Sequence, residues 1–78
     1  MVKAYSLISC DPGMTSEIFD EVEKIEGVQT VEAVAGPYDM IANIEAESLE
    51  KLTGTVFGNI RGVEGVTSTT TLIVVDIE

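Results

Sequence analysis

The chain has 78 residues, of which 45% are hydrophobic, and its fourteen Asp and Glu against four Lys and Arg give a formal net charge of −10. This length suits one small domain, which buries only about 60% of the surface of its unfolded chain, so further copies are expected to complete the core. The acidic balance excludes a phosphate-binding surface, so neither direct nucleic-acid binding nor an anionic membrane surface is expected.

Several kinds of chemistry are excluded by what the composition lacks. With no histidine, His-based acid-base catalysis and His metal sites cannot form, and no P-loop or dinucleotide fingerprint is present. We therefore expect no catalytic residues, no metal and no cofactor. Leu7-Ile8-Ser9-Cys10 resembles a lipoprotein cleavage box, but the apolar run before it is too short for a signal peptide. Cys10 is instead expected to be a small buried residue of a cytoplasmic protein.

The first half of the chain predicts a strand, a helix and a second strand. Val2–Cys10 suits a strand, which Asp11-Pro12-Gly13 stops because Pro cannot donate to a ladder. Thr15 or Ser16 is the predicted N-cap of a helix that ends at Gly27. Its inner face is formed by Ile18, Phe19, Val22 and Ile25.

A hairpin is predicted at the centre of the chain. The β-rich runs 28–35 and 38–44 are joined by Gly36-Pro37, which fits a two-residue type II′ turn. One face of the second run is apolar throughout: Tyr38, Met40, Ala42, Ile44 and Ala46.

The second half repeats this pattern. A helix is predicted to begin near Glu47-Ser48, with Leu49, Leu52, Val56 and Ile60 as its inner stripe and with Gly54 and Gly58 on a face open to close approach. A last strand, 66–77, is apolar on both faces near its end. The motif Ile-x-Gly-Val-x-x-Val at 25–31 recurs 35 positions later at 60–66, which indicates two similar strand-helix-strand halves.

The order β-α-β-β-α-β predicts an α+β, ferredoxin-like split βαβ fold: a four-stranded antiparallel sheet with two helices on one face. Such a sheet leaves its second face bare. Because Leu72 and Val74 point to one side and Ile73, Val75 and Ile77 to the other, both faces need cover. A homodimer that packs sheet against sheet would supply it.

Two polar groups stand out as candidate binding residues. Thr67, Thr69 and Thr71 share one strand face by the period of two, and aligned hydroxyls can both donate and accept hydrogen bonds. Tyr38 and Asp39 follow the central turn, where Asp39 either binds a ligand or fixes its own turn.

At these residues the sequence resembles the effector-binding (RAM) domain of the Lrp/AsnC family of transcriptional regulators. Val31–Asp39 is similar to that family's strand and Gly-x-Tyr/Phe-Asp turn, and Ser68–Val74 to its Thr-x-Thr-x-Ile-Val signature. Between them, Gly62-Val63 and Gly65-Val66 precede the last strand as they do in the family. The likeness spans essentially all 78 residues.

This resemblance implies a single ligand-binding domain over residues 1–78 that senses a free amino acid and is not an enzyme. Its dimers are expected to assemble into an octamer or larger ring, with the ligand between dimers. The implied ligand-binding residues are Gly36, Tyr38, Asp39, Thr67, Thr69 and Thr71. Pro37 departs from many relatives, which have a free amide there.

The chain also departs from the family's regulators because Met1 begins directly at the first strand, without their N-terminal helix-turn-helix. It thus looks like a stand-alone domain that lacks a DNA-binding domain and acts on transcription by co-assembly with a full-length Lrp/AsnC regulator. Two alternatives share the order of elements: an ACT-like amino-acid-binding module and a small dimeric α/β-barrel enzyme.

Overall fold

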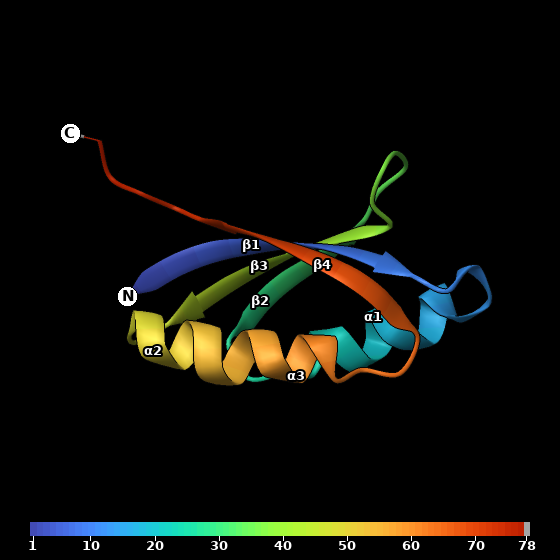
Figure 1. Ribbon diagram of the computed structural model, residues 1–78, viewed down its shortest axis with the longest axis horizontal. Coiled ribbons are helices and arrows are strands. Elements are labelled where there is room, and N and C mark those ends of the chain that lie inside the picture. The colour runs from blue at the N-terminus through green and yellow to red at the C-terminus, as the bar shows by residue number, and fades with distance from the viewer. Residues whose placement is uncertain (78) are drawn as a thin grey trace.

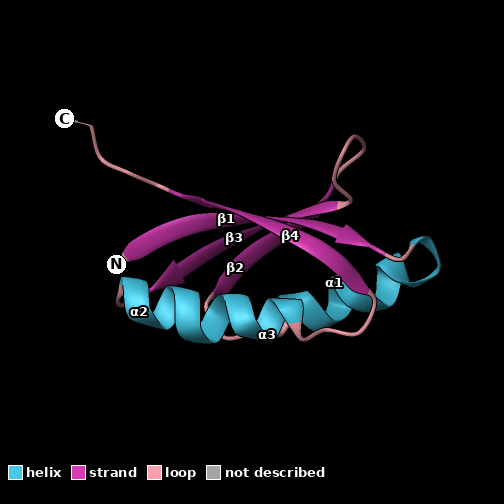
Figure 2. Cartoon of the chain, in the orientation of Figure 1, coloured by secondary structure: helices cyan, strands magenta, loops and turns pink. Residues whose placement is uncertain are grey.

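The structure, a computed structural model, describes residues 1–77. Its four strands form one antiparallel sheet in the order β2-β3-β1-β4. The helices all lie against one face of that sheet (Figures 1 and 2). The elements are β1 (Val2–Cys10), α1 (Thr15–Glu23), β2 (Val28–Ala33), β3 (Met40–Ala46), α2 (Leu49–Lys51), α3 (Phe57–Arg61) and β4 (Val66–Ile73). The predicted ferredoxin-like fold is confirmed.

The core lies between the sheet and the helices. Alternate residues of the two central strands are buried there, as a period of two requires: Ala4, Ser6, Ile8, Cys10, Met40, Ala42, Ile44 and Ala46. They pack against Ile18, Val22, Leu52, Val56, Phe57 and Ile60 of the helices. Leu49 was predicted to join this stripe, but it is 52% exposed because it lies in the first turn of its helix. Ser6 is fully buried, and its Oγ has no hydrogen-bond partner within residues 1–77, which costs stability.

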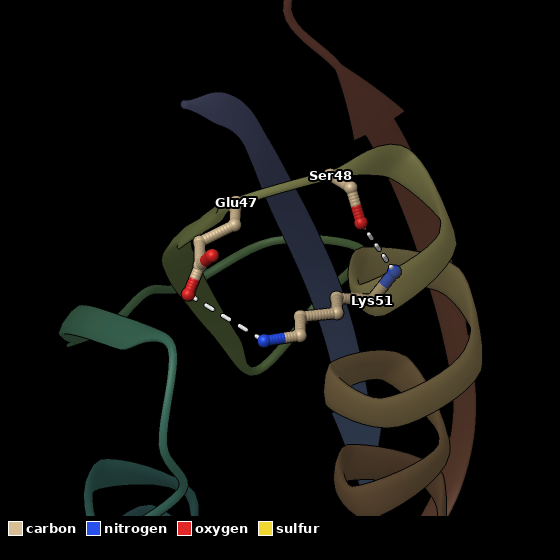
Figure 3. Close-up of polar contacts among 3 residues, drawn as sticks. All are labelled: Glu47, Ser48 and Lys51. Atoms are coloured by element: carbon tan, nitrogen blue, oxygen red, sulfur yellow. Dashed lines mark hydrogen bonds and ion pairs between the residues drawn. The ribbon is translucent and has the colours of Figure 1, made fainter.

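The helix starts are capped differently from each other. Before α1, Pro12–Met14 forms a 3-10 turn, and Asp11 Oδ1 accepts a hydrogen bond from Gly13 N at 3.3 Å. Thr15 and Ser16 were predicted as N-caps, but the preceding turn places both inside the helix. The second helix begins where predicted: Ser48 Oγ accepts from Lys51 N at 3.2 Å, and Lys51 Nζ lies 3.5 Å from Glu47 Oε1 (Figure 3).

Between α2 and α3 the helix continues with π-type hydrogen bonding over Leu52–Val56. The Phe57 N–H accordingly bonds to Leu52 O, five residues back. A Cβ placed on Gly54 or Gly58 would meet no atom within 4 Å. Within residues 1–77, a methyl group at either glycine would therefore find free space.

The central hairpin is longer than the two-residue turn that the sequence predicts. β2 ends at Ala33 and β3 begins at Met40, so residues 34–39 form the connection, closed by Val34 N donating to Asp39 O at 3.0 Å. The reason lies outside the hairpin. Asp39 N donates to Ile8 O of β1 at 2.9 Å. Asp39 is therefore held against β1 and is not free to form a two-residue turn. The loop projects beyond the sheet, in green in Figure 1.

The last strand is shorter than predicted. β4 pairs with β1 from Val66 to Ile73, and one more hydrogen bond, Val74 N to Lys3 O at 2.9 Å, fixes the chain beyond it. β4 ends at Ile73, and beyond Val74 the chain extends away from the body of the sheet (Figure 1). Val75 is 72% exposed and Ile77 88% exposed.

The two halves repeat at a spacing of 38 residues rather than the predicted 35. Gly27 and Gly65, 38 positions apart, have φ of 100° and 98°, and each precedes a strand. Ile18 and Phe19 of α1 correspond in the same way to Val56 and Phe57. The sequence motif aligned Gly27 with Gly62 because both follow a helix, but Gly62 has φ of −77°, and it is Gly65 that shares the positive φ of Gly27.

Candidate functional site

The predicted binding residues lie at the end of the sheet where β1 stops. On one side of β1 is the hairpin 34–39, and on the other is the start of β4. Asp11 N donates to Gly65 O at 2.8 Å and Asp39 N donates to Ile8 O at 2.9 Å, so β1 links both segments. The topology thus brings two segments more than 25 residues apart in sequence to one end of the molecule.

The side chain of Asp39 fixes the end of β1 rather than its own turn. Its Oδ2 accepts a hydrogen bond from Cys10 N at 2.8 Å, and the carboxylate is half-buried. A charged acceptor strengthens such a bond. Any ligand contact made by Asp39 therefore has to share this carboxylate with Cys10.

Tyr38 reaches across β1 to β4. Its hydroxyl lies 3.3 Å from Thr70 Oγ1. Thr70 is opposite Leu7, and Leu7 is opposite Ile41, so this contact lies on the sheet face that the helices leave open. Thr70 was not among the residues predicted from the sequence. Tyr38 was, because it stands at the start of the second predicted strand.

The predicted threonines lie on the other face. Thr69 is opposite Ile8 and Thr71 opposite Ser6, and both of these β1 residues face the helices. Thr69 is half-buried, and Thr71 is exposed. Thr67 lies where the register shifts beside Ser9 and Cys10, and it is exposed. The sheet therefore separates Thr69 and Thr71 from the Tyr38–Thr70 pair.

Gly36 is at the exposed tip of the hairpin, with φ of 145°. A Cβ there would meet no atom within 4 Å, so backbone conformation and not space favours glycine. Of the six predicted residues, the structure directly links only Tyr38 to the β4 segment, through Thr70.

The electrostatics of this end come from Asp39. Burial raises the pKa of the Cys10 thiol, and the nearby Asp39 carboxylate raises it further. Within residues 1–77, no group of three or more His, Cys, Asp or Glu is arranged to hold a metal ion. No helix in the same range is long and apolar enough to cross a bilayer.

A model of the Lrp/AsnC ligand binding domain matches residues 3–77. The chain belongs to the Lrp/AsnC family. An uncharacterised HTH-type transcriptional regulator of Pyrococcus furiosus is 34% identical to it over 73 residues, which are 90% of this chain and 49% of the regulator. The chain thus spans about half the length of the curated Lrp/AsnC-type regulators that it matches.

The chain is also similar to an enzyme and to several solved structures. A homocitrate synthase of Sulfolobus acidocaldarius is 31% identical over 74 residues, 94% of this chain but only 16% of the enzyme. Among solved structures, TTHA0845 from Thermus thermophilus superposes with a TM-score of 0.91 at 28% identity, covering 100% of this chain and 98% of the other. A feast or famine regulatory protein of M. tuberculosis, complexed with L-methionine, shares the fold with a TM-score of 0.82 at 23% identity (97% and 51% coverage). The family match favours the Lrp/AsnC interpretation over the ACT-like and α/β-barrel alternatives.

Cys10 is expected to react slowly. Alkylation by iodoacetamide at pH 8 should be at least about tenfold slower in the folded protein than in urea, because the thiol is buried and its pKa is raised. As the pH rises, the Cys10 thiol of the unfolded chain loses its proton near its ordinary pKa of 9.0, at a lower pH than in the folded chain. Stability should therefore fall as the pH rises above about 9. Cys10→Ala should reduce this fall in urea titrations, and equal alkylation rates in both states would contradict the expected burial.

Proposed function

We infer that this chain is an amino-acid-sensing domain that acts as an oligomer and is not itself catalytic. The family match over residues 3–77 carries this proposal. The L-methionine complex of a regulator with the same fold is in keeping with a free amino acid as effector.

The proposed site joins the hairpin and the start of β4, between dimers. A free amino acid presents an ammonium group and a carboxylate, which need acceptors and donors a few ångströms apart. Asp39 and nearby carbonyls are the proposed acceptors. The turn amides near Gly36 and the hydroxyls of Thr69 and Thr71 are the proposed donors, and Tyr38 and Thr67 are proposed to border the site. Hydroxyls and amides hold a carboxylate less strongly than a bidentate Arg, so we expect affinities in the micromolar to millimolar range.

The proposed oligomer is a sheet-to-sheet homodimer that assembles further into an octamer or larger ring. Influence on transcription would run through co-assembly with a full-length Lrp/AsnC regulator, since a net charge of −10 opposes direct DNA binding. The curated relatives that are named as HTH-type regulators are about twice as long as the stretch they share with this chain.

Calorimetry with each of the twenty amino acids should find one or a few that bind. Thr69→Val should weaken binding by about 1–3 kcal/mol, because it removes a hydroxyl while keeping the side-chain shape. Thr70→Val is the matched control, since Thr70 faces the other side of the sheet. If no amino acid binds, the proposed function is wrong. If Thr70→Val weakens binding and Thr69→Val does not, the ligand lies with Tyr38 on the open face.

A second candidate is regulation of an enzyme rather than of a DNA-binding protein. The homocitrate synthase relative, in which the similar stretch is 16% of the chain, favours it. Co-purification from the source organism separates the two: a full-length regulator supports the first proposal, and a metabolic enzyme supports the second.

A further inference from the structure

A groove opens between α1 and α3, lined by residues of both helices and of the segment that follows α3. Its volume is about 570 Å³, and its walls include Glu17 and Glu21 of α1 and Gly58 of α3, with Glu64 at one end. The two helices run along the same face of the sheet (Figure 1).

The floor of the groove is apolar and lies close to helix backbone. Ile18 is buried beneath it, and Met14 and Val63 are half-buried along it. Gly58 is the residue that keeps the groove open, because a Cβ built there would meet no atom within 4 Å. A helix placed in the groove could therefore approach α3 closely while burying apolar side chains on this floor.

The rim of the groove is negatively charged. Glu17, Glu21 and Glu64 are all exposed. The nearest ion pair joins Lys24 Nζ to Glu21 Oε1 at 3.7 Å and is itself highly exposed, so it neutralises little. Apolar floor and acidic rim together match a helix with an apolar stripe flanked by Lys or Arg.

A second copy of this chain does not have such a helix. Its four cations, Lys3, Lys24, Lys51 and Arg61, are at least ten residues apart, so no helix of the chain carries two neighbouring cations on one face. We propose that the α1–α3 groove is a docking site for a cationic amphipathic helix of another protein. This interaction goes beyond the proposed function and does not require that an amino acid bind.

The probe is a fluorescein-labelled peptide of Leu and Lys, roughly 18 residues and about 27 Å long as a helix, with Leu on one face. The control peptide has Glu in place of every Lys. Fluorescence anisotropy with the full chain should show binding of the Lys peptide that weakens as salt is raised, and no binding of the Glu peptide. Binding of both peptides would overturn the role of the acidic rim.

Two pairs of variants locate the site. Gly58→Leu fills the groove and should weaken binding of the Lys peptide at least about tenfold. Gly54→Leu, on the same helix but outside the groove, should leave this binding unchanged. The double variant Glu17→Lys/Glu64→Lys should weaken binding of the Lys peptide more than the double variant Glu23→Lys/Glu50→Lys. The second variant changes the net charge equally, at exposed positions outside the groove. The exposed charge variants keep the test decisive if Gly58→Leu fails to fold. If the two double charge variants weakened binding equally, the proposal would be overturned, because the attraction would then be non-specific. The same holds if Gly58→Leu and Gly54→Leu both fold and weaken binding equally.

Discussion

Gly27→Ala is expected to lower the free energy of unfolding by about 2–4 kcal/mol, a large share of the stability of a domain this small. Gly27 has φ of 100°, where a side chain is strained, and its Cβ would lie 2.9 Å from Val56 Cγ2 and 3.3 Å from Glu45 O. Neither neighbour can yield easily, because Val56 is a buried β-branched residue and Glu45 O is backbone. Urea denaturation followed by circular dichroism measures the loss.

Two other glycines make the comparison sharp. At Gly65 φ is similar, but the three atoms nearest a Cβ are all side-chain ends, Ile18 Cδ1, Met14 Sδ and Met14 Cε, and none is backbone, so Gly65→Ala should cost less than Gly27→Ala. Gly58→Ala should instead stabilise by up to about 1 kcal/mol, since Gly58 is helical and has free space around it. An equal loss at positions 27 and 58 would contradict the strain that we assign to Gly27.

Val75→Asp is expected to dissociate the proposed oligomer without unfolding the chain. Size exclusion with light scattering should give a mass several times the 8.3 kDa of one chain for the wild type, and a smaller mass for the variant. The reason is that Val75 is 72% exposed in a single chain, so an aspartate there stays in water unless a partner covers it. Burying it unpaired in an interface costs several kcal/mol.

Leu72→Asp should act in the same way, since Leu72 is opposite Tyr5 on the open face and is 50% exposed. Leu49→Asp is the control: Leu49 is similarly exposed but lies at the start of the second helix, on the other side of the sheet. A wild-type protein that is monomeric at micromolar concentration would contradict the sheet-to-sheet dimer. Loss of the oligomer in the Leu49 variant alone would move the interface to the helices.

Sequence periodicity predicted the strands and helices well because burial follows it closely here. Met40, Ala42, Ile44 and Ala46 alternate to the core as predicted. The failures occurred where partners distant in sequence decide the local structure. β1 holds Asp39 by two hydrogen bonds, and so lengthens a hairpin that Gly36-Pro37 alone would make tight.

The candidate site was predicted less fully than the fold. Alternation correctly grouped Thr69 with Thr71, but it could not say that the shared face was the one toward the helices, because β4 is polar on both faces at its start. That assignment depends on the register with β1. The Tyr38–Thr70 contact spans 32 positions and needs the strand order, which no local pattern contains.

The 38-residue repeat has a consequence for the connectivity of the fold. In each half the first strand (β1 or β3) is central, and the last (β2 or β4) is at an edge. The β2–β3 hairpin joins the edge strand of the first half to the central strand of the second. Its counterpart would be a loop that joins β4 to β1. Those two strands are already antiparallel neighbours, and Val74 lies beside Lys3. The two halves could therefore exchange their order along the chain, as in a circular permutation opened at Gly36, with every strand pair retained.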